Sequence, residues 1–247
     1  MTKILVTGST GIGGAVAARL GERALTVGRH GRIRADLSSL EQTSQAAEEI
    51  AASHDRLDAI VCCAGVFTMR AALTGEGLER AYVLNYLSRF LLIGRLLPLL
   101  PPDGRVVLVA SAGRYRDTSA NRTWGMGVAG RTQFANDLYA VELAARHPSL
   151  SVACVYPGLV ATRVFRDATG VPAALRWVMD ALQQRIGASP ESAARRPVRL
   201  AIGPRFASGF YGPSAKPLTV PARVRDGRRT ELWTESEELT TRVRSQG

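Results

Sequence analysis

A glycine-rich turn close to the start of the chain has the spacing of an anion-binding loop. Four glycines within seven residues separate the apolar run 4–6 from an alanine-rich segment with good helix propensity. A buried strand, a glycine turn and a helix offer bare backbone amides and a helix N-terminus to a pyrophosphate group. The pattern predicts a dinucleotide-binding turn, and the alternative is a strand-to-helix connection that binds nothing. The residues expected to contact the dinucleotide in this turn are Gly8, Ser9, Thr10, Gly11, Ile12 and Gly14.

Arg29 and Asp36 follow the next two expected strands, residues 24–27 and 32–35. A residue just beyond the second strand reaches the adenosine ribose, where a guanidinium can clamp a 2′-phosphate and an acid favours a free 2′-hydroxyl. Arg29 therefore favours NADP(H) over NAD(H), unless it is an ordinary surface arginine. Asp36, with Leu37 beside it, could accept a hydrogen bond from the adenine amino group or could cap the helix that follows.

Two polar side chains are placed where a reacting substrate could meet them. Ser111 follows the valine-rich run 105–110, and the carboxyl ends of parallel strands are where ligands bind. Asn85 lies inside a long apolar helical segment, residues 77–97, where asparagine is a poor helix former and is expected to bond backbone or water. The small pair Ala64-Gly65 would let the backbone lie close to a cofactor.

Apolar runs with strand character alternate with helical segments along the whole chain. Strands are expected at residues 4–6, 24–27, 32–35, 58–62, 105–110, 151–155 and 209–211. Helices are expected after the glycine turn and at residues 40–53, 77–97, 127–146, 173–185, from 189 and from about 230. This alternation predicts an α/β fold in which residues 1–247 form a single, doubly wound parallel sheet with helices on both faces.

The composition excludes several classes of protein. The net charge of +11 comes almost entirely from scattered arginines, since only Lys3 and Lys216 are lysines, so we expect no nucleic-acid partner. No apolar run is long enough to span a membrane, and the first strand begins early, so we expect neither a membrane span nor a signal peptide. Cys62, Cys63 and Cys154 lack metal-binding spacing, which predicts no metal site and a reduced, cytoplasmic protein.

Together these motifs resemble the short-chain dehydrogenase/reductase family, and in particular its retinol-dehydrogenase-like branch. The residues that carry the resemblance are Thr7, Gly8, Gly11, Asp36, Leu37, Ala64, Gly65, Asn85, Ser111, Pro157, Gly158 and Thr162, then 189–191, 208–211 and 232–239. The resemblance implies a Rossmann-type sheet in which Ala64, Gly65, Pro157, Gly158 and Thr162 also line the dinucleotide. It further implies that Asn85 and Ser111 belong to the catalytic group.

The helix that should carry the catalytic tyrosine and lysine departs from the family. Where the branch reads Tyr-x-x-Ser-Lys, this chain reads Ala129-Gly130-Arg131-Thr132-Gln133, and no tyrosine anywhere has a lysine four residues later. In the family the lysine lowers the tyrosine pKa from its free value of about 10, so that the phenol can transfer a proton near neutrality. Alanine transfers no proton, whereas Gln133 can still hydrogen-bond the ribose next to the nicotinamide.

Other groups could replace the missing acid. Tyr115 lies four residues beyond Ser111, and Arg114 and Arg116 on either side are expected to lower its pKa. Asp137 and Arg131 lie near the missing pair and are further candidates. The catalytic group predicted from the sequence is therefore Ser111, Asn85, Tyr115 and Gln133.

Three functions are consistent with these residues. The first is an NADP(H)-dependent oxidoreductase with a substituted proton donor, acting on a small apolar carbonyl or alcohol. The second is a non-redox enzyme on the same scaffold, such as a cyclase, dehydratase or isomerase of secondary metabolism. The third is a cofactor-sensing protein without turnover, which the fold alone does not exclude.

Two further expectations concern substrate and assembly. Residues 160–188 should form a lid over the substrate, and their apolar side chains indicate a hydrophobic small-molecule ligand. These side chains are Phe165, Val171, Leu175, Trp177 and Met179. The family resemblance implies that the helix of Asn85 and the helix 127–146 form an association face, so a homodimer or homotetramer is expected.

Overall fold

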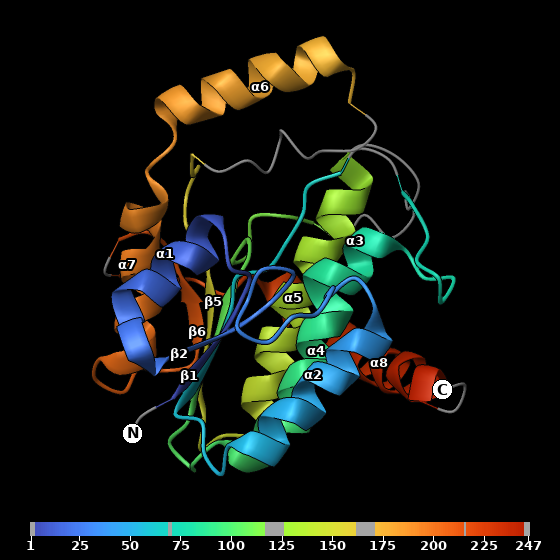
Figure 1. Cartoon of the computed structure of the whole chain (residues 1–247), viewed down its shortest axis with the longest axis vertical. Coiled ribbons are helices and arrows are strands. Elements are labelled where there is room, and N and C mark those ends of the chain that lie inside the picture. Colours follow the sequence, from blue (N-terminus) through green and yellow to red (C-terminus); the bar gives the residue numbers. More distant parts are fainter. Residues whose placement is uncertain (1–2, 69–70, 117–125, 162–170, 215, 245–247) are drawn as a thin grey trace.

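A seven-stranded sheet forms the centre of the computed structural model, which describes residues 3–68, 71–116, 126–161, 171–214 and 216–244 (Figure 1). Its order is β2-β1-β3-β4-β5-β6-β7, and every pair is parallel except β6 with β7. The strands are β1 (Ile4–Thr7), β2 (Ala24–Val27), β3 (Ala59–Cys62), β4 (Arg105–Val109), β5 (Ser151–Val155), β6 (Gly209–Tyr211) and β7 (Pro217–Leu218). The predicted doubly wound α/β fold is confirmed.

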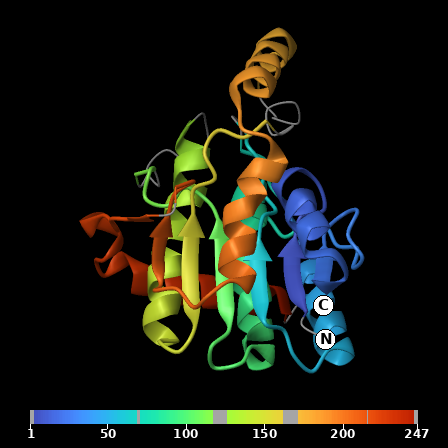
Figure 2. The same cartoon turned by 90° about the vertical axis from the view of Figure 1, so that its left-hand side faces the viewer.

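Helices cover both faces of this sheet. One face packs against α1 (Gly11–Leu20) and α7 (Pro190–Ile202), which lie in front of the strands in Figure 2. The other packs against α2 (Leu40–Ser53), α4 (Ser88–Leu96) and α5 (Met126–Arg146). The remaining elements are α6 (Ala173–Ile186), α8 (Arg228–Arg244), the short turns α3 (Arg80–Tyr82), η1 (Gly21–Arg23), η3 (Leu97–Leu99) and η4 (Ala222–Val224), and the π-helical turn η2 (Val83–Leu87).

The central strands β1 and β3 are buried at every position, which explains their mainly apolar sequences. Along β1, Leu5 packs with the helices α2, α4 and α5, while Ile4 and Val6 on either side of it pack with α1 and α7. Each of the three side chains is fully buried. Burial at this level is worth about 1.5–3 kcal/mol for each such side chain, so the two layers hold the carboxyl edge of the sheet in place.

The strand predicted at residues 32–35 is not part of the sheet. Only Ile33 pairs there, through a single parallel bridge to Val27. The physical reason is chain length: a parallel neighbour in a sheet needs a crossover of a dozen residues or more, and here only residues 28–31 separate the two segments. The antiparallel strand β7 was not predicted, because two residues carry no readable alternation.

The helix predicted at residues 77–97 starts later and is interrupted. Gly77 has φ +75° and lies in a turn closed by the antiparallel bridge between Leu73 and Glu79. The Glu79 carboxylate then accepts hydrogen bonds from the amides of Ala81 and Tyr82 and so caps the helix start. A π-helical turn follows and leads into α4.

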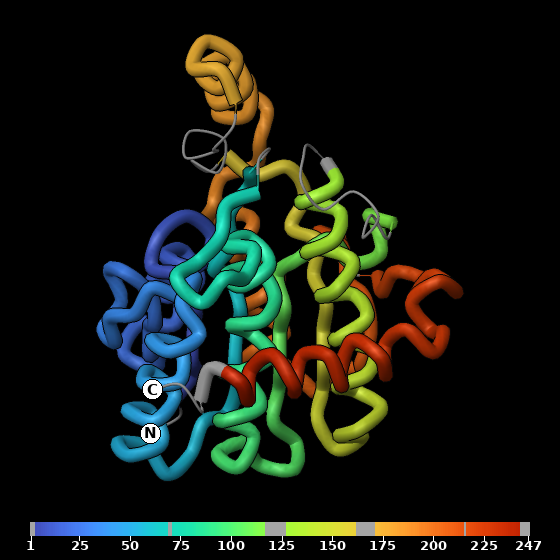
Figure 3. The backbone as a smooth tube through the Cα atoms, turned by 90° about the vertical axis from the view of Figure 1, so that its right-hand side faces the viewer, coloured from blue at the N-terminus to red at the C-terminus, as the bar shows by residue number. Residues whose placement is uncertain are grey.

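The outer face of α4 and α5, which the family resemblance assigned to association between copies, is covered by α8 of the same chain (Figure 3). Trp233 of α8 packs against Phe90 and Tyr139, with ring centroids 5.0 and 5.8 Å away. Below them the Tyr86 hydroxyl and the Ser236 hydroxyl form a buried hydrogen bond of 2.7 Å. Among the described residues, α8 therefore occupies part of the face expected to associate, and the homodimer or homotetramer stays a prediction.

The segment expected to be a lid is described in part, at residues 160–161 and 171–188. The helix predicted at 173–185 is α6, which lies beyond the carboxyl edge of the sheet (Figures 1 and 2). Its base is fastened by a bridge between Val160 and Ala188 and by a hydrogen bond of 2.6 Å from Gln183 Nε2 to the Val160 carbonyl oxygen. Leu175 and Trp177 are exposed. Residues 162–170, with Phe165, lie outside the described part of the chain.

None of the helices in the described part of the chain combines the length and the apolar character that crossing a bilayer requires.

The packing of α8 predicts a difference between two tryptophans. Trp233→Ala should lower the free energy of unfolding by about 2–3 kcal/mol, because it removes ring contacts and leaves a partly exposed cavity. Trp177→Ala is the matched control, since this side chain is 73% exposed on α6 and should change stability by less than about 0.5 kcal/mol. Urea unfolding of both variants measures the difference. Equal losses would show that α8 does not stabilise the core.

Candidate functional site

The glycine turn holds the N-terminus of α1 open toward the carboxyl edge of the sheet. Gly8 and Gly11 have φ values of +86° and +53°, which residues with a side chain rarely adopt. Thr10 is the N-cap residue, but its side chain makes no capping hydrogen bond. The amide of Gly14 bonds to the Thr10 carbonyl oxygen at 3.2 Å, so the first intrahelical bond starts there. The amides before Gly14 make no hydrogen bond within the helix, as an anion-binding helix N-terminus requires.

The sequence prediction omitted the tightest glycine of this turn. A Cβ at Gly13 would clash with the carbonyl oxygen of Gly8, whereas a Cβ at Gly14 would lie 2.9 Å from the Ser9 carbonyl oxygen. Both positions are therefore needed to bring α1 against the turn. Gly13 is buried and shapes the turn from behind, while Gly14 is partly exposed. Counting motif spacing alone could not separate these two roles.

The loop after β3 lies against the glycine turn. A Cβ at Gly8 would be 3.2 Å from the backbone of Ala64, so the two loops are in close contact. Thr7 Oγ1 accepts hydrogen bonds from the amides of Cys63 and Ala64, at 3.2 and 3.1 Å. Gly65 is exposed, and a Cβ there would lie 3.3 Å from Asn85 Oδ1. The predicted cofactor residues Gly8, Ala64 and Gly65 are thus brought together.

Asn85 uses its side chain to hold this loop. Its Oδ1 accepts from the Val66 amide at 2.8 Å, and its Nδ2 donates to the Val66 carbonyl oxygen at 2.9 Å. The side chain is 4% exposed and lies in the π-helical turn. Asn136 of α5 donates to the Asn85 carbonyl oxygen at 2.9 Å. Of the two alternatives for Asn85, bonding to backbone is therefore the observed one, and its role is to position the loop.

Arg89 lies at the carboxyl edge of the sheet, and its role there was not predicted from the sequence. Its guanidinium is buried and donates to the Val109 carbonyl oxygen at 3.0 Å, to Asn136 Oδ1 at 2.9 Å and to the Ala64 carbonyl oxygen at 2.7 Å. Burial lowers its pKa from the usual value. An arginine one helical turn after Asn85, within an apolar segment, was the available signal. Arg89 ties the carboxyl ends of β3 and β4 to α5.

Ser111 and Asp137 form a buried pair at the end of β4. The Ser111 hydroxyl donates to Asp137 Oδ2 at 3.2 Å, and the Gly113 amide donates to the same oxygen at 2.9 Å. Ser111 is 2% exposed and Asp137 is 0% exposed. Between the two donors the backbone of Ala112 adopts φ +46°, a strained conformation that costs about 1–2 kcal/mol for a residue with a side chain. The strained backbone of Ala112 lets the Ser111 hydroxyl and the Gly113 amide both donate to Asp137 Oδ2.

Asp137 titrates close to neutrality. Burial raises its pKa to about 6, although hydrogen bonds from Cys154, Gly113 and Ser111 and the charge of Arg223 act in the opposite direction. The Cys154 thiol donates to Oδ1 at 3.3 Å. Because Asp137 makes no ion pair within the described residues, desolvation outweighs these donors. A carboxyl group that can gain or lose a proton near pH 6 lies one hydrogen bond from Ser111.

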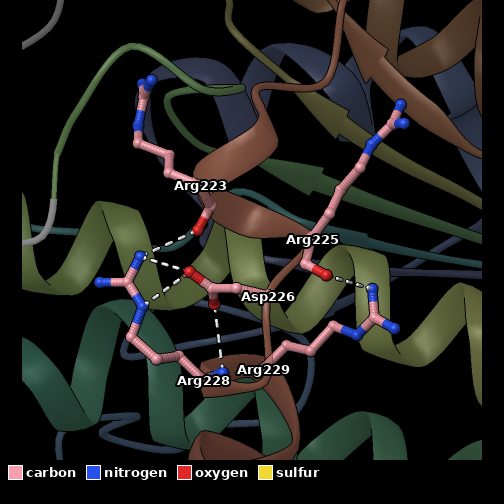
Figure 4. Close-up of polar contacts among 5 residues, drawn as sticks. All are labelled: Arg223, Arg225, Asp226, Arg228 and Arg229. Atoms are coloured by element: carbon pink, nitrogen blue, oxygen red, sulfur yellow. Dashed lines mark hydrogen bonds and ion pairs between the residues drawn. The ribbon is translucent and has the colours of Figure 1, made fainter.

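Arg223 holds the loop that carries Ser111. Its Nη2 donates to the carbonyl oxygens of Gly113 and Tyr115. The backbone around it is fixed in turn by Arg228, which donates to the Arg223 carbonyl oxygen at 3.0 Å and pairs with Asp226 at 2.8 Å (Figure 4). In the same turn Arg229 donates to the Arg225 carbonyl oxygen (Figure 4). Several of the chain's arginines are therefore structural braces.

Tyr115 does not have the lowered pKa that its neighbours in sequence predicted. Burial, followed by the charge of Tyr156, raises the pKa of its phenol. The guanidinium of Arg114 is turned away and lies 4.0 Å over the ring of Tyr156. Adjacency in sequence failed because successive loop side chains point in different directions. Tyr115 is thus a poor proton donor near neutrality.

The positions of the missing dyad lie on α5. Ala129 is partly exposed there, and one turn later the Oε1 atom of Gln133 is buried without a hydrogen-bond partner among the described residues. An orphaned acceptor costs about 1–3 kcal/mol, so this atom is suited to a ligand hydroxyl. Arg131, one of the suggested substitutes, lies 3.8 Å over the ring of Tyr82 and so has its own partner.

Arg29 and Asp36 lie close together beyond β2. Arg29 is exposed, and its charge acts on Asp36 together with that of Arg80, 4.0 Å away. Partial burial raises the Asp36 pKa, but hydrogen bonds from Ser38 and these two charges hold it below the usual value. Asp36 Oδ1 accepts from the Ser38 amide and hydroxyl, while Ser39 caps α2. Asp36 therefore caps the turn before the helix, not the helix itself.

The loop after β5 completes the predicted set. Tyr156 is hydrogen-bonded to β6 through its amide, and Pro157 and Gly158 follow at the same edge of the sheet as Ser111. Gly158 has φ +87°, which fits a sharp turn away from the sheet. Leu37 is buried beside the turn of Asp36. Thr162 lies outside the described residues.

This arrangement fits a dinucleotide. An uncapped helix N-terminus, two loops in contact that leave no room for side chains, and the orphaned Gln133 oxygen lie along one edge of the sheet. Within the described residues no group of three or more His, Cys, Asp or Glu side chains could hold a metal ion.

The titration of Asp137 predicts a pH-dependent stability. Its raised pKa means that the Asp137 carboxyl binds a proton more tightly in the folded than in the unfolded chain. The stability that depends on this proton is therefore fully present below pH 3.8 and is lost as pH rises through about 6. Wild type should lose about 1.4 kcal/mol between pH 5 and pH 7.5 relative to Asp137→Asn. Urea unfolding at both pH values measures this. Asp226→Asn, a surface acid with a lowered pKa, should follow wild type; a wild type that parallels Asp137→Asn would contradict the assignment.

Comparison with known proteins agrees with this geometry. The family model described as enoyl-(acyl carrier protein) reductase, of the short alcohol-dehydrogenase type, matches residues 8–202. Retinol dehydrogenase 14 of Mus musculus is 27% identical over 216 residues, or 82% of the chain. The chain spans 64% of the length of that curated relative.

Two solved structures show the same fold. An uncharacterized protein from Mycobacterium paratuberculosis superposes with a TM-score of 0.71 at 22% identity, covering 98% of this chain and 94% of its own. A blue fluorescent protein from a metagenomic library, solved in complex with NADPH, superposes with a TM-score of 0.65 at 20% identity, covering 85% and 94%. Because the family match extends over most of the sheet and the site at its edge, the chain belongs to the short-chain dehydrogenase/reductase family of oxidoreductases.

Proposed function

We propose that this chain is an NADP(H)-dependent oxidoreductase that interconverts a small apolar carbonyl compound and its alcohol without the family's tyrosine donor. The observation that carries the proposal is the open N-terminus of α1, packed by glycines against the loop of Ala64. Backbone amides at such a terminus favour a pyrophosphate, and a similar fold is known in complex with NADPH. When bound, the nicotinamide supplies or accepts hydride.

Gln133 supports a cofactor with ribose hydroxyls next to the nicotinamide. Its Oε1 atom is buried and lacks a partner, so a hydroxyl donor there would satisfy it. Glutamine brings no charge, and Ala129 no proton. The chain can hold the nicotinamide ribose while lacking the group that lowers a phenol pKa. Removal of a general acid typically costs about 10²–10⁴ in rate, so turnover depends on another proton donor.

The substrate class follows from the relatives and from α6. The retinol dehydrogenases are named for an apolar alcohol. The exposed Leu175, Val178 and Leu182 of α6 form an apolar stripe beyond the edge of the sheet where Ser111 and Gly158 lie. An apolar alcohol or aldehyde is therefore the first substrate to test, with all-trans-retinol and all-trans-retinal as probes. A non-redox reaction and pure cofactor sensing have no comparable support.

The first prediction concerns cofactor choice. Arg29→Ala should weaken NADPH binding about 10-fold, or about 1.4 kcal/mol, because a charge-assisted bond to the 2′-phosphate is lost. NADH binding should stay unchanged, since that cofactor has no 2′-phosphate. Calorimetric titration of both dinucleotides measures the ratio. Arg23→Ala, at the amino end of β2, is the matched control and should bind like wild type. If the wild-type protein binds neither NADPH nor NADH, the proposed function is wrong.

The second prediction restores the family dyad. Ala129→Tyr combined with Gln133→Lys should raise the rate of retinal reduction by NADPH about 10²–10⁴-fold, because it returns a phenol and a cation that lowers its pKa. Ala129→Tyr alone should gain much less, since its phenol keeps a pKa near 10. Steady-state rates at pH 7 measure the gain. No gain in a folded, NADPH-binding double variant would mean that the site no longer holds a carbonyl in line with this dyad.

A further inference from the structure

The buried pair of Ser111 and Asp137 has the composition of a proton relay. We infer that Asp137 receives at Oδ2, through the Ser111 hydroxyl, the proton that an alcohol substrate loses on oxidation, and returns it to the carbonyl oxygen on reduction. The inference rests on the proposed function, because it names the group that does the work of the missing tyrosine.

The observed hydrogen bonds have the direction that a base needs. The Ser111 hydroxyl donates to Asp137 Oδ2 at 3.2 Å, so the lone pairs of its oxygen are free to accept a substrate hydroxyl. The Gly113 amide donates to the same carboxylate oxygen at 2.9 Å and fixes its position. Ala112, at φ +46°, maintains the turn that points both donors inward. Ser111 follows β4 at the carboxyl edge, where this fold places its ligands.

The groups around Asp137 leave it free to titrate. Cys154 from β5 donates its thiol to Oδ1, on the side away from Ser111. Burial raises the Cys154 pKa well above its usual value, so the thiol remains protonated. Arg223 from η4 contributes a positive charge, but its Nη2 is bonded to the carbonyl oxygens of Gly113 and Tyr115. Among the residues that the structure describes, Asp137 therefore has hydrogen-bond donors around it but no ion-pair partner, and it gains a proton more readily than a surface acid.

The proposed step balances. With NADP⁺ bound as the hydride acceptor, oxidation of the alcohol would pass the alcohol proton to Ser111 Oγ and the Ser111 proton to Asp137 Oδ2, leaving the carbonyl compound and a neutral Asp137. Because Asp137 is fully buried, its proton would return through the Ser111 hydroxyl to solvent after the product leaves. Reduction reverses each transfer, starting from neutral Asp137. Oxidation should therefore increase as pH rises through the Asp137 pKa, and reduction should decrease.

The first test observes Asp137 without cofactor or substrate. Carbon-13 NMR of the aspartate carboxyl groups, assigned with Asp137→Asn, should give an Asp137 pKa near the expected value of about 6. Ser111→Ala removes a donor to Oδ2, and Cys154→Ala removes the donor to Oδ1, so each should raise that pKa. An Asp137 that titrates below pH 4, or that does not respond to Ser111→Ala, would overturn the inference whether or not any substrate is known.

The second test separates proton transfer from simple packing, using all-trans-retinol with NADP⁺ and all-trans-retinal with NADPH. Ser111→Ala should lower both rates about 100-fold or more and remove the dependence on pH, because the path to Asp137 is cut. Cys154→Ala keeps that path, so its pH profile should move upward with the Asp137 pKa. A pH profile that stays unchanged in Cys154→Ala while the pKa moves would refute the relay.

NADPH titration of each variant keeps this inference distinct from the proposed function. Ser111→Ala and Cys154→Ala should bind NADPH within about threefold of wild type, because neither residue is expected to contact the dinucleotide. If wild type fails to bind NADPH, the proposed function fails while the Asp137 titration is still judged on its own. If the variants bind NADPH and the Asp137 pKa does not respond to Ser111→Ala, only the relay fails.

Discussion

A buried guanidinium organises the edge of the sheet where the site lies. Arg89 is 4% exposed and donates to the backbone at the ends of β3 and β4 and to Asn136 of α5. A buried charge is costly unless its donors are satisfied, and here carbonyl oxygens satisfy most of them. Arg89 therefore fixes the ends of β3 and β4 and the helix α5 relative to one another. The loop of Ala64, the serine after β4 and the helix that carries Gln133 all depend on it.

The candidate site combines a family scaffold with the replacement of the proton donor that we propose. Glycines, the loop of Ala64 and the π-helical turn of Asn85 keep the shape that holds a dinucleotide. The helix α5 has lost the tyrosine and lysine, yet one turn beyond Gln133 it presents Asp137 to the hydroxyl of Ser111. Burial raises the pKa of that carboxyl toward neutrality, which a surface carboxylate would not experience. Burial thus raises the pKa of the Asp137 carboxyl toward neutrality. In related enzymes the lysine brings the tyrosine pKa toward neutrality from the other side, by lowering it.

The predictions that held were those made from strong, local patterns. The runs 24–27 and 151–155 are strands with those bounds: 151–155 is buried at every position, and 24–27, at the edge of the sheet, is buried at alternate positions. The region 32–35 was misread because buried Ile33 and Ala35 alternate with exposed arginines as in a strand, but its connection is too short for a parallel crossover. Tyr115 was misread because charge was inferred from neighbours in sequence, whereas Arg114 stacks on Tyr156.

The sequence by itself determined the alternation of strands and helices, the glycine turn and the absence of the Tyr-x-x-x-Lys pair. These are properties of residue type and spacing, and no folding is needed to read them. Only the tertiary structure decided that Arg89 is a buried tie, that α8 covers the outer face of α4 and α5, and that Asp137 faces Ser111. Each of those results joins residues more than twenty positions apart or depends on burial, and a linear pattern carries neither distance nor dielectric environment.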